Sequence, residues 1–314
     1  MNRISMASLL LLLAFGASVP VHAQGMELKA LNAEIVSLYK QGHYERAIEA
    51  AEKALRVAEQ AGGFNHPTVA LSQNNLALLY KMQGQYTKAE SLYYRSLMIK
   101  EKALGPDHLS VAISLNNLAT LYETQGRYAK AEPLYQRSLA IKEKFLGPDH
   151  FSVATSLNNL AELYRTQGNY GKAEPLYQRS LAIREKVLGP DHPNVALSLS
   201  NLAALYVAQG RYAEAQALYK RSLAIKERTL GPDHLSVAVS LDILADLHYT
   251  QGQYAQAELL HQRSLAIREK TLGTNHPNVA TSLEKTAALY RKTNREEAAA
   301  TLEKRAASIR ATKQ

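Results

Sequence analysis

The sequence contains no cysteine and no tryptophan, and only four of its 314 residues are phenylalanine. The lack of cysteine excludes disulfide bonds, thiolate metal ligands, cysteine nucleophiles and an acylated N-terminal cysteine. The patterns of a phosphate-binding loop, of an H-E-x-x-H zinc helix and of a G-x-S-x-G nucleophile turn are missing as well. These absences favour a protein that is not an enzyme and that needs neither a cofactor nor a metal.

Long apolar runs are also scarce, and the one that stands out lies near the N-terminus, from Leu9 to Ala17. It follows Arg3 and precedes Val21 and Ala23, small residues three and one before a cleavage point, so the pattern predicts a secretory signal peptide over residues 1–23. The run is shorter than the roughly 20 residues that a membrane span needs, and we expect no stable membrane insertion. The chain is therefore predicted to be exported, either periplasmic or secreted.

The rest of the chain is dominated by an internal repeat of 42 residues, of which the stretch from Leu157 to Gly189 is a representative copy. A fixed period of this size is typical of stacked repeat architectures. Asn294 takes the next place in the glycine series, and Asn tolerates the left-handed conformation that a turn glycine adopts. The glycines that mark the period are Gly42, Gly84, Gly126, Gly168, Gly210 and Gly252.

Each repeat contains two helical patterns. Leu157, Leu160, Ala161 and Tyr164 are spaced as one face of an amphipathic helix. Gly168 ends that pattern, and a second one runs to Leu188, before Gly189 and Pro190. A two-helix hairpin has more apolar surface than it can bury alone, so neighbouring copies must stack.

The order Leu157-x2-Leu160-Ala161-x2-Tyr164, followed by Ala173-x3-Tyr177, resembles the tetratricopeptide repeat. The standard unit has about 34 residues. The longer unit here, with its L-G-P-D-H loop, is similar to the repeats of kinesin light chains and related bacterial proteins. The resemblance covers roughly residues 28–309 and implies an all-α, right-handed superhelical solenoid of about seven helix-turn-helix repeats that binds a protein or peptide in its concave face.

The repeat boundaries predict a signal peptide at 1–23, an atypical first unit at 24–65, five 42-residue units over 66–276 and a C-terminal capping unit at 277–314. The last unit carries Glu296 and Glu303 where earlier units have Tyr, and polar end units keep a solenoid soluble. No linker or additional domain is evident between the units, so we expect one continuous array.

Six of the ten histidines recur at the repeat period, in the loop before each first helix. Equivalent positions in successive units lie too far apart to share a metal, so a structural role is expected. The preceding aspartates are well placed to cap or favour the helix N-terminus. The histidines are His66, His108, His150, His192, His234 and His276, and the aspartates are Asp107, Asp149, Asp191 and Asp233.

His248 and His261 differ, because they replace the two tyrosines of the repeat within one unit. A two-histidine metal site would need a third ligand, and Asp246 is expected to face another way, so the simpler interpretation is substitution of one planar polar ring for another. All but three of the 18 tyrosines occupy repeat packing positions. They are predicted to be core residues, which argues against nucleic-acid binding.

An asparagine ladder on the first helices is the best candidate for a binding surface. The second members of its pairs, Asn75, Asn117, Asn159 and Asn201, are expected to bond to the adjacent helix and fix the stack, whereas the first members are expected to face the groove. A groove that is amide-rich and mildly basic at one end, and acidic near Glu284 at the other, would bind a peptide in one direction. The candidate groove residues are Asn74, Lys81, Asn116, Asn158, Glu162, Arg165, Ser200, Asp242 and Asp246.

The function that these patterns favour is a non-enzymatic scaffold or adaptor for a protein or an extended peptide. The alternative is a periplasmic holdase or accessory factor that captures unfolded exported chains. A hydrolase that uses His248 is a third possibility. The formal charge of +9, or +8 without Arg3, permits loose attraction to anionic surfaces.

Overall fold

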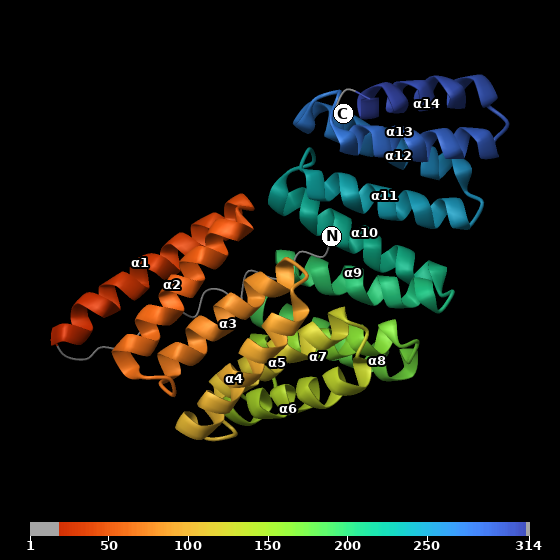
Figure 1. Ribbon diagram of the computed structural model, residues 1–314. Coiled ribbons are helices and arrows are strands. Elements are labelled where there is room, and N and C mark those ends of the chain that lie inside the picture. The colour runs from red at the N-terminus through yellow and green to blue at the C-terminus, as the bar shows by residue number, and fades with distance from the viewer. Residues whose placement is uncertain (1–18, 312–314) are drawn as a thin grey trace. The chain divides into compact units, whose positions relative to one another are not determined.

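The computed structural model describes residues 19–311, and this part of the chain contains fourteen α-helices and no strand (Figure 1). In the central repeats, first helices of 16 residues alternate with second helices of 19 residues. The helices are α1 (Val19–Gln41), α2 (Tyr44–Gly62), α3 (Pro67–Met82), α4 (Tyr86–Leu104), α5 (Leu109–Thr124), α6 (Tyr128–Leu146), α7 (Phe151–Thr166), α8 (Tyr170–Leu188), α9 (Pro193–Ala208), α10 (Tyr212–Leu230), α11 (Leu235–Thr250), α12 (Tyr254–Leu272), α13 (Pro277–Lys292) and α14 (Glu296–Ala311).

The helices group into two compact units, with the division inside α7 between Leu163 and Tyr164. In the first unit, consecutive helices from α1 to α6 pack against one another in chain order. In the second unit, the helices from α8 to α14 include the packed hairpins α9–α10, α11–α12 and α13–α14. The predicted all-α fold of seven consecutive helix pairs is thereby confirmed.

Tight turns separate the helices of a pair, and each needs a left-handed residue. Gly84 and Gly126 have φ values of 74° and 71°, which side chains with a Cβ rarely adopt. Asn294, at the next place in the glycine series, has φ 58° and is the one non-glycine residue with positive φ among residues 19–311. The prediction that Asn294 replaces a turn glycine is therefore confirmed.

The core of each unit combines small residues with large rings. Tyr93 and Tyr135 are only 1% exposed, and Ala89 and Ala131 are fully buried beside them on the same helices. In the second unit, Val195, Ala196, Leu199 and Ile225 form one cluster, and the equivalent residues one repeat later form another. The regular tyrosines inside the helices, such as Tyr93, Tyr135 and Tyr177, are core residues, as the spacing predicts, whereas those that begin the second helices, such as Tyr128 and Tyr170, are half-buried.

The loop histidines, rather than the aspartates before them, cap the first helices. His108 takes the N-cap position of α5, and its Nδ1 accepts a hydrogen bond from the backbone N–H of Ser110 at 3.1 Å. Asp107 instead forms an ion pair with Lys144 of the next repeat at 2.7 Å. The expected structural role is confirmed for the histidines. Asp107 does not cap α5, because its carboxylate binds Lys144 and the imidazole of His108 accepts the cap hydrogen bond instead.

In the C-terminal unit, ion pairs between its two helices take the place of the buried tyrosine rings. Arg291 of α13 binds Glu303 of α14 at 2.7 Å and also pairs with Glu296. These are the two glutamates that stand where earlier repeats have tyrosine. Both carboxylates are about half exposed, so the last hairpin presents a hydrated surface.

The predicted signal peptide lies mostly outside the described residues, which begin at Val19. Helix α1 runs from Val19 through the predicted cleavage point after Ala23. None of the helices between residues 19 and 311 combines the length and the apolar character that a bilayer-spanning helix requires. Helices α6 and α8 continue through Pro133 and Pro175.

Candidate peptide-binding face

The asparagine ladder links the first helices of neighbouring repeats in the first unit. Asn117 Nδ2 donates to Asn74 Oδ1 at 3.0 Å, and Asn159 Nδ2 donates to Asn116 Oδ1 at the same distance. Asn117 and Asn159, the second members of their pairs, thus bond to the adjacent first helix, as expected. The acceptor is the first member of the preceding pair, which the sequence analysis had assigned to the groove alone.

The ladder residues differ in their exposure to solvent. Asn74 is 4% exposed and its oxygen is engaged by Asn117, whereas Asn116, Asn117 and Asn159 are half-buried. The half-buried amides keep hydrogen-bonding capacity beyond the ladder bond, since an amide offers two donors and two acceptor lone pairs. The open part of the ladder is therefore centred on α5 and α7.

Asn32 of α1 occupies the same place in the repeat as Asn74 but does not extend the ladder, because its Oδ1 accepts no hydrogen bond. The sequence analysis missed this position, although Asn32 lies 42 residues before Asn74 and the period alone was a sufficient signal. Its side chain is 8% exposed. Gln73, beside Asn74, is fully buried where other repeats have leucine, and its amide is likewise without a partner.

A row of cations, also missed, runs beside the ladder at the same period. Lys100 Nζ donates to Ser114 Oγ at 2.8 Å, and Lys142 Nζ donates to Ser156 Oγ at 2.7 Å. In the second unit Lys226 bonds to Ser240 at 2.7 Å by the same 14-residue offset. Each cation sits on a second helix, and its serine lies on the first helix of the following repeat.

Lys100 and Lys142 are buried cations that no carboxylate neutralises. They are 6% and 9% exposed, and neither forms an ion pair. Burial lowers the pKa of each ammonium from 10.5 to about 8. Burial also lowers the pKa of Lys81 to about 8, although the charge of Glu123 opposes this shift. Such a cation is costly unless an anion compensates it.

The equivalent position in the sixth repeat shows this cation with its charge compensated. Arg268 lies 168 residues, four periods, after Lys100, and its Nη2 is 2.6 Å from Asp242 Oδ2. Asp242 occupies the ladder position of Asn74, so the cation at this place in the repeat reaches the ladder. His261 Nδ1 also lies 3.3 Å from Asp242 Oδ1.

In the second unit, the acidic residues at the ladder positions are paired with cations, contrary to the sequence interpretation of an acidic groove end. Asp242 is paired as described, Asp246 pairs with Lys285 at 2.6 Å, and Glu284 pairs with Arg310 at 2.7 Å. Asp246 also does not face away from the histidines, because its Oδ1 is 3.7 Å from His261 Nε2. No group of three metal-ligating side chains is assembled anywhere in residues 19–311.

The other predicted groove residues lie on α7 and α9. Asn158, Glu162 and Arg165 are half-buried. Burial raises the pKa of Tyr135 and of Tyr219; the charge of Glu162 adds to the first rise, and the charge of Arg165 opposes the second. Ser200 bonds to Ser222 of α10 at 2.8 Å, so it supports its own hairpin.

His248 takes part in a hydrogen-bonded contact between neighbouring repeats that contains charged residues one repeat earlier. In the fifth repeat, Tyr206 donates to Glu174 at 3.0 Å, and Arg211 binds the same carboxylate at 2.8 Å. One repeat later these three places are taken by His248, Gln216 and Gln253, and the histidine contacts both amides. Tyrosine, glutamate and arginine are replaced together, which explains His248 as a packing residue.

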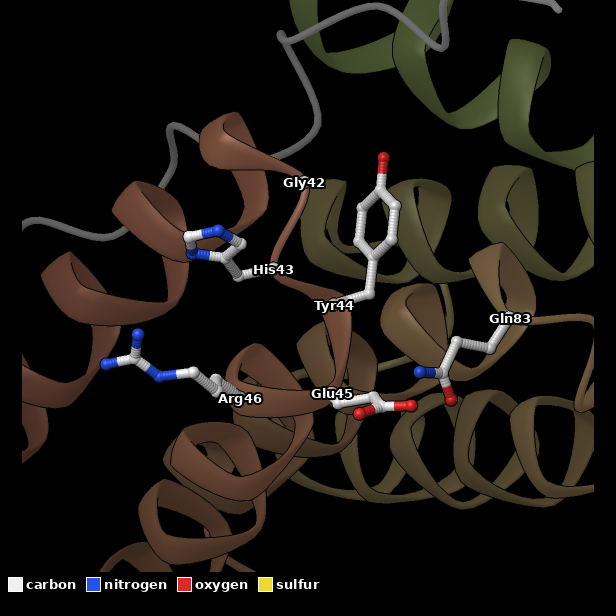
Figure 2. Close-up of a pocket in the computed structure, with 6 residues that line it drawn as sticks. All are labelled: Gly42, His43, Tyr44, Glu45, Arg46 and Gln83. Carbon is white, nitrogen blue, oxygen red and sulfur yellow. The ribbon is translucent and has the colours of Figure 1, made fainter. Parts of the chain in front are cut away.

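A hollow of about 390 Å³ lies at the turn between α1 and α2. It is lined by Gly42, His43, Tyr44, Glu45, Arg46 and Gln83. In Figure 2 the His43 and Tyr44 side chains point in different directions, so they do not converge on a common point. This hollow contains neither the ladder nor the row of cations.

Comparison with known proteins identifies the repeat. The model of the tetratricopeptide repeat matches residues 28–102, 68–144, 124–186, 152–228, 199–270 and 244–312. The search of curated proteins found no match.

Several solved structures are similar. BtubC (BKLC) from P. vanneervenii is 26% identical with a TM-score of 0.64, covering 73% of this chain and 92% of that chain. A putative kinesin light chain with nearly identical TPR-like repeats from Podosopora anserina is 33% identical with a TM-score of 0.59, covering 66% and 98%. The apo form of RapI, 16% identical with a TM-score of 0.61, shares the fold. The chain therefore belongs to the tetratricopeptide repeat family, and its repeats are of the kinesin-light-chain type.

Proposed function

We propose that this protein is a non-enzymatic scaffold that binds an extended, carboxylate-bearing segment of a partner protein along the ladder face. We define the ladder face as Asn116, Asn117 and Asn159 together with Lys100 and Lys142. Proteins built from tetratricopeptide repeats are typically interaction scaffolds, and the proposal concerns which surface and which partner chemistry this chain uses.

The observation that carries the proposal is the unneutralised pair of ammonium groups on Lys100 and Lys142. Each has a single serine hydroxyl as its hydrogen-bond acceptor, although an ammonium offers three donors. The sixth repeat supplies a carboxylate to the equivalent cation from its own ladder position. A partner's Asp or Glu side chain, placed against the half-buried Asn116, would supply the same group to the first unit.

The amides of the ladder suit the main chain of such a segment. Asn116 and Asn159 lie on the first helices of successive repeats, and each amide has both donors and acceptors. An extended chain offers N–H and C=O groups along its length. The long stem of lysine lets its ammonium move from the serine to an incoming carboxylate. The amides would thus bind the main chain of the segment, and the lysines would select its acidic side chains.

Binding to a defined acidic probe tests the proposal. A fluorescein-labelled peptide of alternating Ser and Glu is titrated with the full chain, beside an otherwise identical peptide of alternating Ser and Lys. We expect the acidic peptide alone to bind, with an affinity that falls as salt is added. Lys100→Met and Lys142→Met should each weaken binding about tenfold, whereas Lys102→Met, at an exposed position of the same helix, should not.

Equal binding of the two peptides, or equal binding by Lys100→Met and Lys102→Met, would remove the ladder face as the site. Binding of many unfolded chains without dependence on the lysines would favour the holdase alternative.

We also propose that the protein acts outside the cytoplasm, because residues 1–23 have the pattern of a secretory signal peptide. N-terminal sequencing of the protein isolated from its native cells tests this. We expect a chain that begins at Gln24, and an intact Met1 would refute export by this route.

A further inference from the structure

Helix α4 exposes two large apolar side chains at places that are small or polar in the repeats that follow. Tyr94 is 55% exposed and Met98 is 49% exposed, and they lie one helical turn apart on the same face. This face of α4 therefore differs from that of its copies. The equivalent residues are Gln136, Gln178, Lys220 and Gln262 for the tyrosine, and Ala140, Ala182, Ala224 and Ala266 for the methionine.

Arg95 lies on the same face, is exposed, and lacks the ion pair that its copies form. One period later, Arg137 binds Glu101 of the preceding second helix at 2.6 Å. Glu59 stands at the corresponding place of α2, but within residues 19–311 no ion pair joins it to Arg95. Arg95 therefore keeps its charge available to a group outside the chain. Later repeats form the pair as Arg221 with Glu185, Arg263 with Glu227 and Arg305 with Glu269.

Lys102, one turn beyond Met98, is a second exposed cation without a carboxylate. Its copy Lys144 binds Asp107 at 2.7 Å. In the loop before α3, Asn65 takes the place of this aspartate, and Lys102 forms no ion pair in the described part of the chain. The exposed face of α4 thus combines apolar area with two unbalanced positive charges. Later copies of the pair are Arg228 with Asp191 and Lys270 with Asp233.

The side chains on this face are arranged symmetrically about Met98. Arg95 lies three residues before it and Glu101 three residues after it, and Tyr94 and Lys102 lie four residues before and after it. All four neighbour Met98 on the helix surface, because residues three and four apart are adjacent there. Two copies of α4 that cross in opposite directions at Met98 bring each Arg95 opposite Glu101 of the second copy. The same crossing brings each Lys102 opposite Tyr94.

Both contacts are of kinds that the chain already makes. The carboxylate of Glu101 binds Arg137 at 2.6 Å, remains 24% exposed, and has lone pairs for a second guanidinium. Lys88, also on α4, lies over the ring of Tyr80, 4.9 Å from its centre. A second copy of the chain therefore supplies a partner for each unpaired cation and covers the two apolar side chains.

We infer that the exposed face of α4 is a homodimer interface in which two copies of the helix pack antiparallel across a two-fold axis at Met98. Such an interface is isologous, so the surface that forms it must complement itself, as this face does. Lys100 lies two residues from Met98, about 200° around the helix, and is buried away from this face. Dimer formation therefore leaves the ladder face open, and the inference does not depend on the proposed acidic partner.

Sedimentation equilibrium of the full chain at concentrations up to about 100 µM tests the interface, since a single helix crossing belongs to the weak end of protein contacts. We expect a monomer–dimer equilibrium for the original protein. Arg95→Glu and Glu101→Arg each place like charges opposite one another and should raise the dissociation constant at least about tenfold. An equimolar mixture of these two variants should dimerise again, because every contact then joins opposite charges. Arg221→Glu, at the equivalent place of α10, is the control and should leave the dimer unchanged.

A single cysteine gives an independent readout, because the chain has none of its own. Met98→Cys places two thiols beside the two-fold axis, so a disulfide-linked dimer should form at least about tenfold faster than from Ala224→Cys, the equivalent place of α10. This readout holds even where Glu101→Arg, which also loses the Arg137 pair, fails to fold. A protein that stays monomeric, a mixture that does not restore the dimer, or equal cross-linking at the two positions overturns the inference and leaves this face to a different partner.

Discussion

Replacing Lys100 by methionine should stabilise this protein while weakening its binding to an acidic partner. Methionine keeps the unbranched stem of lysine and removes the buried charge. A lowering of the pKa from 10.5 to about 8 means that the folded protein holds this ammonium at a cost of about 3 kcal/mol below pH 8. Loss of the Ser114 hydrogen bond offsets about 1 kcal/mol of this. The expected net gain at pH 7 is about 2 kcal/mol.

The pH dependence of stability follows from the same pKa. Because the folded pKa lies below the unfolded one, the unfolded chain binds more protons between pH 8 and 10.5, and stability rises with pH in that range. Lys142 and Lys81 contribute in the same direction. Above about pH 10 the effect reverses, because burial raises the pKa of Tyr93 and other core tyrosines, and the unfolded chain then loses protons first.

Urea unfolding of the full chain at pH 7, 8 and 9.5 measures both effects, with Lys102→Met as the control at an exposed site of the same helix. The original protein should gain about 1 to 2 kcal/mol per buried lysine between pH 8 and 9.5, and Lys100→Met should gain correspondingly less. Destabilisation by Lys100→Met at pH 7, or an unchanged pH slope, would refute a buried, uncompensated ammonium at this position.

Three further outcomes follow from particular contacts. Asn117→Ala should cost about 1–3 kcal/mol in urea unfolding, because it leaves the buried Asn74 oxygen unpaired. Asn159→Ala should cost only about 1 kcal/mol, because its acceptor Asn116 is half-buried and reaches water. Equal costs of the two variants would contradict the ladder. Asp242→Asn should cost about 3 kcal/mol in urea unfolding, because it leaves the nearly buried Arg268 guanidinium without its carboxylate, and an unchanged stability would contradict this pair. Asn294→Val should destabilise the last hairpin by about 1–2 kcal/mol, seen as faster amide exchange in α14, because a β-branched residue resists φ 58°.

The period of 42 residues was enough to predict the helices, the turn glycines and the core tyrosines, because each of these depends on local spacing. Asn294 is an example, because its place in the glycine series alone predicted its left-handed turn conformation. The capping histidines were recognised as structural, but the aspartates beside them have a higher general propensity for N-caps. Which of two adjacent polar residues caps a helix depends on the backbone angles of the loop.

The candidate site was predicted less completely, since its geometry depends on contacts between repeats. Spacing located the asparagine pairs but did not reveal that the first member of one accepts a bond from the second member of the next. The burial of Lys100 and Lys142 has no signal in the sequence and is seen only in the structure. The acids near Asp242 looked free, and only the structure shows the cations that pair with them.

The central claim, that the ladder face holds a partner's acidic segment, is tested most directly by site-specific photo-cross-linking in the native cells. A photoreactive phenylalanine analogue replaces Asn116 on the ladder face or, as the control, Arg137, which is partly exposed and paired with Glu101 of the preceding second helix. The account predicts one dominant adduct from position 116, attached through an acidic segment and lost in the Lys100→Met, Lys142→Met background. Equal adducts from both positions, or an adduct at 116 that persists without the two lysines, would contradict it.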